Sequence, residues 1–416
     1  MISQKYNIFF ELILFFSSFC YIKFFNIGTN SDLQLYYFTI CIIFLIMTLK
    51  KINKEILIGV SILLIVLTYN LFIDYRNLSS FFRGSYSYIS FVIVFYTIYK
   101  LCKKINLKKF EKRIKSYYII WNIVGIIQVF DNSLITFWRY RAGIEGGRGS
   151  ISFGSEPAYY VFFLILSSMI LYSINRKNKY YFIISLIFSG ILAKSFLGTA
   201  YLLVIVIIVY SNRKNILKMI LISIMLTFVM IIFAYNIPNN VNYRILKLLR
   251  EIVKNPFSLI IKDGSARTRI IHIFFSIKGS VENLLLPKGF STWNKYMIIS
   301  LMKYKEFFIL NNEEILRLKE IIDKGIFIKN GINTMFGGII YELGFLGLIF
   351  YNYVYKVCID KKIWIIIMIL SIDGLNITNP YLAVLLGINY FLYKNIKNKS
   401  GDKVNENKIF NNNSLL

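Results

Sequence analysis

Charged residues are scarce in this 416-residue chain: they make up 17% of it, whereas hydrophobic residues make up 56%. A soluble domain of that length needs more polar surface, so the composition argues against a soluble protein. Acidic residues are scarcer than basic ones, 21 against 49, which gives a formal net charge of +28. On a soluble protein that charge would suggest nucleic acid. Here it falls mostly between apolar runs, where orientation in a membrane explains it better, so no nucleic-acid partner is expected.

Cysteine occurs four times, at Cys20, Cys41, Cys102 and Cys358, and no two of these residues form a CxxC pair. The four are scattered over apolar runs and basic turns, which indicates neither a disulfide framework nor a zinc site. No cluster of carboxylates calls for a metal ion either. The sequence therefore predicts no cofactor.

Long apolar runs are what the chain has in quantity. Each run is long enough to cross the roughly 30 Å hydrocarbon core as a helix. Because a backbone in lipid must satisfy its own hydrogen bonds, the runs predict an all-α polytopic membrane protein. The first run lacks a small-residue cleavage site, so we expect a retained helix. Twelve helices are predicted, at about 7–25, 33–49, 55–73, 86–101, 117–131, 157–174, 180–193, 196–210, 219–235, 334–355, 363–375 and 380–393. The last two could also form one broken unit around Asn376 and Pro380.

Basic residues mark every second loop between these helices. The basic segments are 50–54, 103–115, 176–179, 213–218, 356–362 and the tail 394–416. Under the positive-inside rule all six are cytoplasmic, which places both termini inside. Residues 1–235 then hold helices one to nine with an outer loop at 131–156, residues 236–333 form a large extracytoplasmic loop, and residues 334–393 hold helices ten to twelve.

The large loop, 236–333, is the only long segment without a membrane-length apolar run, and it holds His272, the only histidine. It is net basic, and a basic surface beside a membrane attracts anionic substrates or lipid headgroups. Three helices are predicted in it. An amphipathic interfacial helix covers Tyr243–Val253, a second covers Ala266–Lys278, and a third covers Asn312–Lys324.

The outer loop 131–156 concentrates cations and glycines. Arg139, Arg141 and Arg148 precede Glu156 in it. The planar fork of arginine suits phosphate oxygens. Glu156 lies at the positive N-terminus of the helix that Pro157 begins, which favours its ionised form. The alternative is a solvated basic loop with a capping glutamate.

A second cluster lies in the large loop. On a helix, Arg269 and His272 are i,i+3 neighbours and Thr268 and His272 are i,i+4 neighbours, so arginine and histidine on one face could bind phosphate and move a proton. The alternative is a surface histidine on an amphipathic helix. Glu342 lies inside an apolar run and should face the bundle interior or a wet cavity. Asp373, Asn376 and Asn379 lie near an outer edge and are predicted to line the same cavity.

Several of these stretches resemble one family. The run Gly147-Arg148-Gly149-Ser150, followed by Ser155-Glu156-Pro157-Ala158-Tyr159, resembles the outer-loop pattern of bacterial O-antigen and capsule polymerases, the Wzy-type family. Lys194-Ser195-Phe196-Leu197-Gly198 resembles its serine-glycine hairpin, and Tyr341-Glu342-Leu343-Gly344 resembles its Glu-Leu-Gly helix. Arg267 and Arg269 match its arginines at a helix start in the long loop. The related O-antigen ligases carry a histidine-asparagine pair before the next helix. Here that place reads Gly331-Ile332-Asn333, which argues against a ligase.

The resemblance implies a glycosyltransferase with a fold similar to the GT-C-type lipid-sugar transferases of the bacterial cytoplasmic membrane. Its implied substrate is an oligosaccharide repeat unit on undecaprenyl pyrophosphate, polymerised into O-antigen (the polysaccharide of lipopolysaccharide), capsule or another surface polysaccharide by inverting transfer. Membrane lipids and a chain-length regulator protein are the other implied partners. The roles it implies are Arg148, Arg141, Arg267 and Arg269 on the pyrophosphate, Glu156 or His272 as base, and Arg139 and Glu342 lining the cavity. The alternatives are a lipid-linked oligosaccharide flippase or transporter, against which the long outer loop counts, and a non-catalytic scaffold.

Overall fold

The protein is all-helical wherever its structure is described. The computed structural model describes residues 2–20, 35–48, 54–75, 77–130, 149–154, 156–211, 264–308, 310–324 and 331–400. No strand occurs in these ranges. The helices are α1 (Ile2–Ser18), α2 (Leu35–Thr48), α3 (Lys54–Asp74), α4 (Leu78–Cys102), α5 (Leu107–Phe130), α7 (Pro157–Ile174), the 3₁₀ helix η2 (Arg176–Lys179), α8 (Tyr180–Ile191), α9 (Phe196–Tyr210), α13 (Gly264–Glu282), α14 (Trp293–Lys303), α15 (Asn312–Lys324), α16 (Met335–Leu343), α17 (Phe345–Val357), α18 (Lys361–Asp373) and α19 (Pro380–Ser400).

Three of these helices are long and apolar enough to cross a membrane. They are α3, over the range Leu57–Asp74, together with α4 and α7. Two shorter apolar helices cover Leu35–Thr48 and Gly198–Tyr210. The predictions of an all-α protein and of helices of membrane length are therefore confirmed. The predicted span at 219–235 and the amphipathic helix Tyr243–Val253 lie outside the described residues.

Most helix positions follow the sequence prediction, with instructive differences. The third helix predicted in the large loop is α15 with the same bounds, and the second is α13, which extends to Glu282. The helix α14 was not predicted. The fourth predicted helix begins at Leu78 and not near residue 86, so the connection between α3 and α4 is shorter than the predicted helices 55–73 and 86–101 leave. The last two predicted helices are separate, because α18 ends at Asp373 and α19 begins at Pro380.

The predicted single helix 334–355 is wrong, because the chain breaks at Gly344 into α16 and α17. Gly344 has φ +60° and ψ −137°, a conformation that a residue with a Cβ strongly disfavours. The backbone N–H of Phe345 leaves the helical pattern and donates to the carbonyl of Leu285 over 2.7 Å. Glu342 therefore lies in the last turn of a short helix and not within a membrane-long one. Broken helices of this kind occur where they border a cavity or are buried in protein.

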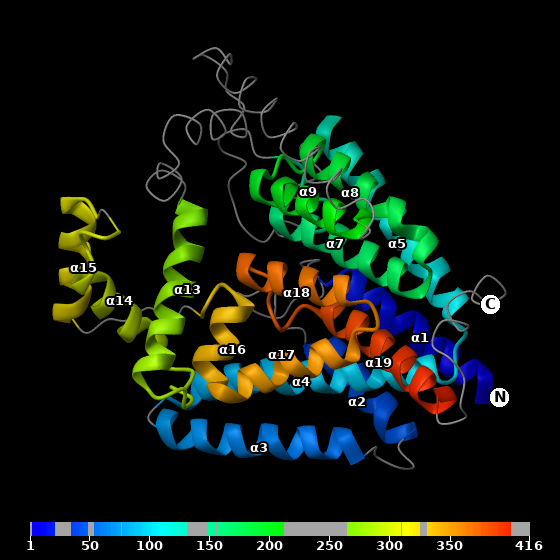
Figure 1. Ribbon diagram of the computed structural model, residues 1–416, viewed down its shortest axis with the longest axis horizontal. Coiled ribbons are helices and arrows are strands. Elements are labelled where there is room, and N and C mark those ends of the chain that lie inside the picture. The colour runs from blue at the N-terminus through cyan, green and yellow to red at the C-terminus, as the bar shows by residue number, and fades with distance from the viewer. Residues whose placement is uncertain are drawn as a thin grey trace.

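The helices of the bundle lie at several angles to one another. In Figure 1, α3 and α4 run along the horizontal and α19 slopes down to the right, whereas α13 and α16 run steeply at the left-hand end, with α14 and α15 farthest out. α4 and α19 pack closely: the rings of Tyr99 and Tyr390 are 4.7 Å apart, and a Cβ on Gly387 would lie 2.8 Å from Ile98. A side chain at Gly387 would force these two helices apart.

Segments predicted on the cytoplasmic side meet at one end of this bundle. Two contacts join these segments directly: Asn178 Nδ2 to Glu111 Oε1 at 2.9 Å and Arg176 to Asp360 at 3.5 Å. Two more join them to neighbouring helix ends: Lys362 Nζ to the Ser211 carbonyl at 2.7 Å and Arg113 to Glu11 at 2.7 Å. At this end, on the right of Figure 1, α1 begins and α19 ends. The opposite end holds α13, α16 and the turns before α4 and α19.

Candidate functional site

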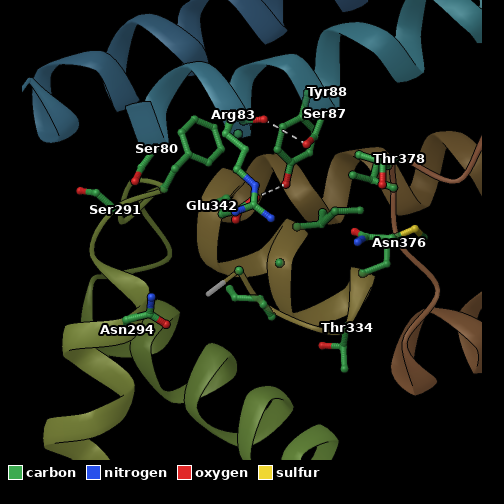
Figure 2. Close-up of a pocket in the computed structure, with 18 of the residues that line it drawn as sticks. Ser80, Arg83, Ser87, Tyr88, Ser291, Asn294, Thr334, Glu342, Asn376 and Thr378 are labelled. Atoms are coloured by element: carbon green, nitrogen blue, oxygen red, sulfur yellow. Dashed lines mark hydrogen bonds between the residues drawn. The ribbon is translucent and has the colours of Figure 1, made fainter. Parts of the chain in front are cut away.

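A polar cavity of about 440 Å³ lies at that opposite end. Four segments far apart in the sequence line it: the first turns of α4, the turn before α14 with its first residues, α16, and the linker 376–378 before α19. Figure 2 shows Arg83 and Tyr88 descending from α4 toward Glu342 on α16, with Asn376 and Thr378 facing them. The cavity is therefore closed only when the large loop packs on the helix bundle.

The lining is rich in groups that hydrogen-bond. Hydroxyls and amides come from Asn77, Ser79, Ser80, Ser87, Ser291, Asn294, Thr334, Asn376 and Thr378. Arg83 and Lys295 add two exposed cations, and Glu342 is the one carboxylate among the lining residues. A surface of hydroxyls and amides beside cations can bind a sugar phosphate, because the amides and hydroxyls pair with sugar hydroxyls and the cations with phosphate oxygens.

Glu342 is held on the cavity wall by two neighbours. The hydroxyl of Tyr88 donates to its Oε2 over 2.7 Å, and the side-chain amide of Asn70 donates to its backbone carbonyl over 3.1 Å. The second bond satisfies a carbonyl that the break at Gly344 leaves without a helical partner. Figure 2 shows the Arg83 guanidinium beside this carboxylate, and the two charges attract. A carboxylate so placed faces ligand atoms in the cavity.

Three helix N-termini open onto the cavity. The lining includes Asn77 and Ser79 at the start of α4, Asn294 and Lys295 at the start of α14, and Thr334 before α16. Helix N-termini carry partial positive charge and unpaired N–H groups, so they favour anions. Together with Arg83 and Lys295, they contribute positive charge to this cavity, which the carboxylates of Glu342 and nearby Asp74 oppose.

Asp74, the last residue of α3, holds one wall in place. Its carboxylate accepts the backbone N–H groups of Phe290, over 2.6 Å, and of Ser291, over 3.0 Å, together with the Ser291 hydroxyl. Gly289 before them has φ +83°, and a Cβ there would lie 2.7 Å from Ile73. The turn that carries Ser291 is thus fixed to the end of a membrane-length helix.

His272 lies behind the cavity wall and does not line it. Its Nδ1 accepts the backbone N–H of Asn333 over 2.8 Å, and its ring packs edge-on against Trp293, 5.2 Å between centroids. Burial lowers the pKa of His272 to about 4. Because Nδ1 already accepts a hydrogen bond, the neutral ring carries its proton on Nε2 and can donate there but not accept. This geometry favours a structural or donor role over that of a base.

The two arginines of the same cluster point to different places. Arg267 forms a two-pronged ion pair with Glu314 of α15, at 2.8 and 3.2 Å, and its side chain is 14% exposed. Burial opposes the charge on Glu314, but Arg267 and the N–H of Asn311 outweigh it and lower its pKa. Arg269 lies at the turn after α18, where a Cβ on Gly374 would be 3.3 Å from its Nε. Neither arginine lines the polar cavity, and their predicted role on the pyrophosphate stays a prediction.

Gln128, a buried side chain, makes several hydrogen bonds to the chain before α7. Its Oε1 accepts from the Ser150 hydroxyl (2.9 Å) and from the N–H groups of Ile151 (3.2 Å) and Ser152 (2.7 Å), and its Nε2 donates to the Ser152 carbonyl (2.9 Å). Glu156 is the half-buried N-cap position of α7 but makes no side-chain cap bond. It does not line the polar cavity. Arg139, Arg141 and Arg148 lie outside the described residues.

An apolar cavity of about 410 Å³ adjoins the polar one. It runs between α3, α4 and α17, and its lining includes Leu63, Phe95 and Phe350. Tyr88 and Ile377 line both cavities. One hydroxyl-bearing ring therefore stands at the junction of a polar and an apolar space, an arrangement suited to a ligand with a polar head and a hydrocarbon tail.

Among the residues predicted for such a cavity, Glu342 and Asn376 line it and Asn379 does not, whereas Arg83, Tyr88 and Lys295 line it without having been predicted. The sequence does carry a signal for Arg83: it lies in Asn77–Ser87, a serine-rich stretch at a helix start, most of which falls before the helix predicted at 86–101. Lys295 carried no signal, because α14 has no strong periodicity. No protein-family model, no curated protein and no solved structure matches this chain. A function for it therefore rests on its motifs and on the geometry of the two cavities.

Proposed function

We propose that this protein is a glycosyltransferase that polymerises lipid-pyrophosphate-linked oligosaccharide repeat units into a surface polysaccharide. The observation that carries the proposal is the pair of adjoining cavities: a cationic polar one that also holds Glu342, and an apolar one reached past Tyr88. A lipid pyrophosphate carrying a sugar has both characters in one molecule. The sequence motifs that resemble Wzy-type polymerases support the same class of substrate.

The polar cavity supplies the groups that this reaction needs. Arg83 and Lys295, with the N-termini of α4, α14 and α16, would hold the pyrophosphate and stabilise the charge that develops as it leaves. Arg141 and Arg148 of the outer loop are proposed to complete the cation set. The hydroxyls and amides of the lining would bind the sugars.

The chemical step is a single displacement. The hydroxyl oxygen of the acceptor sugar forms the new bond to the anomeric carbon of the donor. The bond from that carbon to the pyrophosphate oxygen breaks, and its electron pair leaves with the lipid pyrophosphate. Glu342 takes the proton of the hydroxyl. We assign this role to Glu342 in place of Glu156 or His272 because Glu342 is the carboxylate that lines the cavity.

The proposed setting is the bacterial cytoplasmic membrane, with twelve spans, both termini in the cytoplasm and the polar cavity at the outer face. The basic segments that gather at the other end of the bundle support this orientation. The proposed fold is similar to the GT-C-type transferases. The carrier is proposed to be undecaprenyl pyrophosphate, and the product an O-antigen or capsule whose length a regulator protein sets.

The test is a gel of surface glycan from a strain that lacks the gene, restored with wild type or with variants. Deletion is expected to collapse a ladder to one repeat unit. The double variant Arg83→Ala/Lys295→Ala and the single variant Arg148→Ala are expected not to restore it. Arg317→Ala, on the exposed face of α15 away from the cavity lining, is the matched control and should restore the full ladder.

Other outcomes point to other functions. Complete loss of surface glycan on deletion would favour the lipid-linked oligosaccharide flippase. A full ladder from both the Arg83→Ala/Lys295→Ala and the Arg148→Ala variants would contradict the proposal and favour a scaffold.

A further inference from the structure

The turn between α13 and α14 exposes three consecutive leucines. Leu284 is 85% exposed, Leu285 37% and Leu286 42%, and Val281 just before them is 60% exposed. Leu284 and Leu285 both have positive φ, 55° and 59°. L-residues with branched side chains adopt that conformation reluctantly, and glycine or asparagine is usual there. Leucine at these two positions is therefore unfavourable for the backbone conformation. Its side chain must be favourable in the environment that it contacts.

Every backbone N–H group from residue 283 to residue 286 in this turn has a hydrogen-bond partner. The N–H of Asn283 donates to the carbonyls of both Gly279 and Ser280, and the N–H of Leu284 donates to that of Val281. The N–H of Leu285 donates to the carbonyl of Ser280, and the N–H of Leu286 to that of Asn283; all these distances are 2.7 to 3.2 Å. The side-chain amide of Asn283 donates to the carbonyls of Leu286 and Pro287, at 3.0 and 3.2 Å. The Leu285 carbonyl accepts from Phe345, and Pro287 has no N–H. A surface turn in water has no need of such pairing, whereas in hydrocarbon an unpaired backbone group costs several kcal/mol.

The turn lies beside two helices with exposed apolar faces. Its bond to Phe345 joins it to the start of α17, and Gly289 just after it packs on Ile73 at the end of α3. The exposed apolar residues on these helices include Phe72 at 76%, Phe345 at 46% and Leu348 at 51%. Residues Leu57–Asp74 of α3 form a helix of membrane length. The three leucines therefore continue a surface that faces lipid.

We propose that Leu284–Leu286, the leucine tip, insert into the hydrocarbon of the outer leaflet and anchor the α13–α14 hairpin there, with the ion pair of Lys278 and Glu282 at the level of the headgroups. The occupant of this surface is lipid acyl chain. Ser291, Asn294 and Lys295 follow the tip on the same hairpin and line the polar cavity. The anchor would set that wall of the cavity at the level of the lipid phosphates. This inference does not depend on which reaction the cavity supports.

The experiment is spin-label accessibility in lipid nanodiscs with the full chain. All four native cysteines are buried, so a label on an added cysteine reports the chosen position. Leu284→Cys is the test variant. Phe72→Cys on α3 is the lipid reference, and Glu313→Cys, exposed on α15 within the same large loop, is the water reference.

The label at 284 is expected to collide several-fold more with oxygen, which concentrates in lipid, than with a water-soluble nickel chelate, as at 72. At 313 the order should reverse. A label at 284 that meets nickel as freely as at 313 would overturn the proposal. A label at 284 shielded from both reagents would overturn it in favour of a protein contact, such as a second copy of the chain.

Discussion

Asn333 donates its backbone N–H to Nδ1 of His272 over 2.8 Å, although 61 positions separate them in the chain. The bond ties the middle of α13 to the residue that precedes the cap of α16. In the sequence the histidine lies far from this point, where the residues read Gly331-Ile332-Asn333. In space it occupies the place just before the helix that follows the large loop. Its neutral ring packs on Trp293 of α14 and accepts the bond from the chain just before α16, so it connects these two walls of the polar cavity.

The burial of His272 predicts a loss of stability in acid. Burial lowers its pKa from 6.5 to about 4. Between these values the unfolded chain binds a proton that the folded protein excludes, so stability is full above about pH 6.5 and falls as pH drops toward 4. The loss is at most about 3 kcal/mol. We expect the thermal midpoint of the detergent-solubilised protein to fall between pH 7 and pH 4.5, and to fall less in His272→Gln.

Glutamine is the informative replacement at position 272 because its amide oxygen can still accept from Asn333 but does not titrate. Carboxylates that titrate in the same range are common to both proteins, so the difference between the two profiles isolates the histidine. Parallel profiles for wild type and His272→Gln would show that this ring is not buried in its neutral form.

Glu342→Gln is expected to abolish polymer formation while the protein stays folded. The glutamine oxygen can still accept the Tyr88 hydroxyl, now 2.7 Å from Oε2, but a carboxamide takes no proton. A general base contributes about 10²–10⁴-fold to rate, so the glycan ladder should disappear at normal protein levels. Tyr88→Phe removes only the hydrogen bond and should shorten the ladder without removing it. A full ladder from Glu342→Gln at wild-type level would exclude Glu342 as the base.

The sequence predicted the helices well and the cavity poorly, for one physical reason. Helical periodicity is local, so α13 and α15 could be recognised from their own residues. The cavity is non-local: Arg83, Ser291, Glu342 and Thr378 meet only after four segments fold together. The break at Gly344 was also invisible, because its apolar neighbours continue on both sides. What ends the helix is a contact with Leu285, about 60 residues earlier, which no pattern within 334–355 encodes.

Gln128→Leu is expected to loosen the chain before α7. The change removes the acceptor of two backbone N–H groups, those of Ile151 and Ser152, inside a buried site. Each unsatisfied buried donor costs about 1–3 kcal/mol. The thermal midpoint should fall by several degrees, and protease should cleave near residues 149–154 sooner. Gln128→Glu keeps the acceptor oxygen and should recover part of the loss at low pH, where its carboxyl is protonated. Unchanged proteolysis in Gln128→Leu would show that other contacts hold this segment.

Gly344→Ala and Gly59→Ala should change stability in opposite directions. A Cβ on Gly344 would lie 2.2 Å from the Leu285 carbonyl oxygen, and the φ of +60° there disfavours any L-residue by about 1–3 kcal/mol. The substitution should therefore lower the thermal midpoint and displace the turn that carries the leucine tip. Gly59 lies within α3 with nothing within 4 Å of a built Cβ. Alanine there should stabilise the helix by up to about 1 kcal/mol. If both variants melt like wild type, the break between α16 and α17 does not depend on glycine, and the position of Glu342 on the cavity wall must be held by Asn70 and Tyr88 alone.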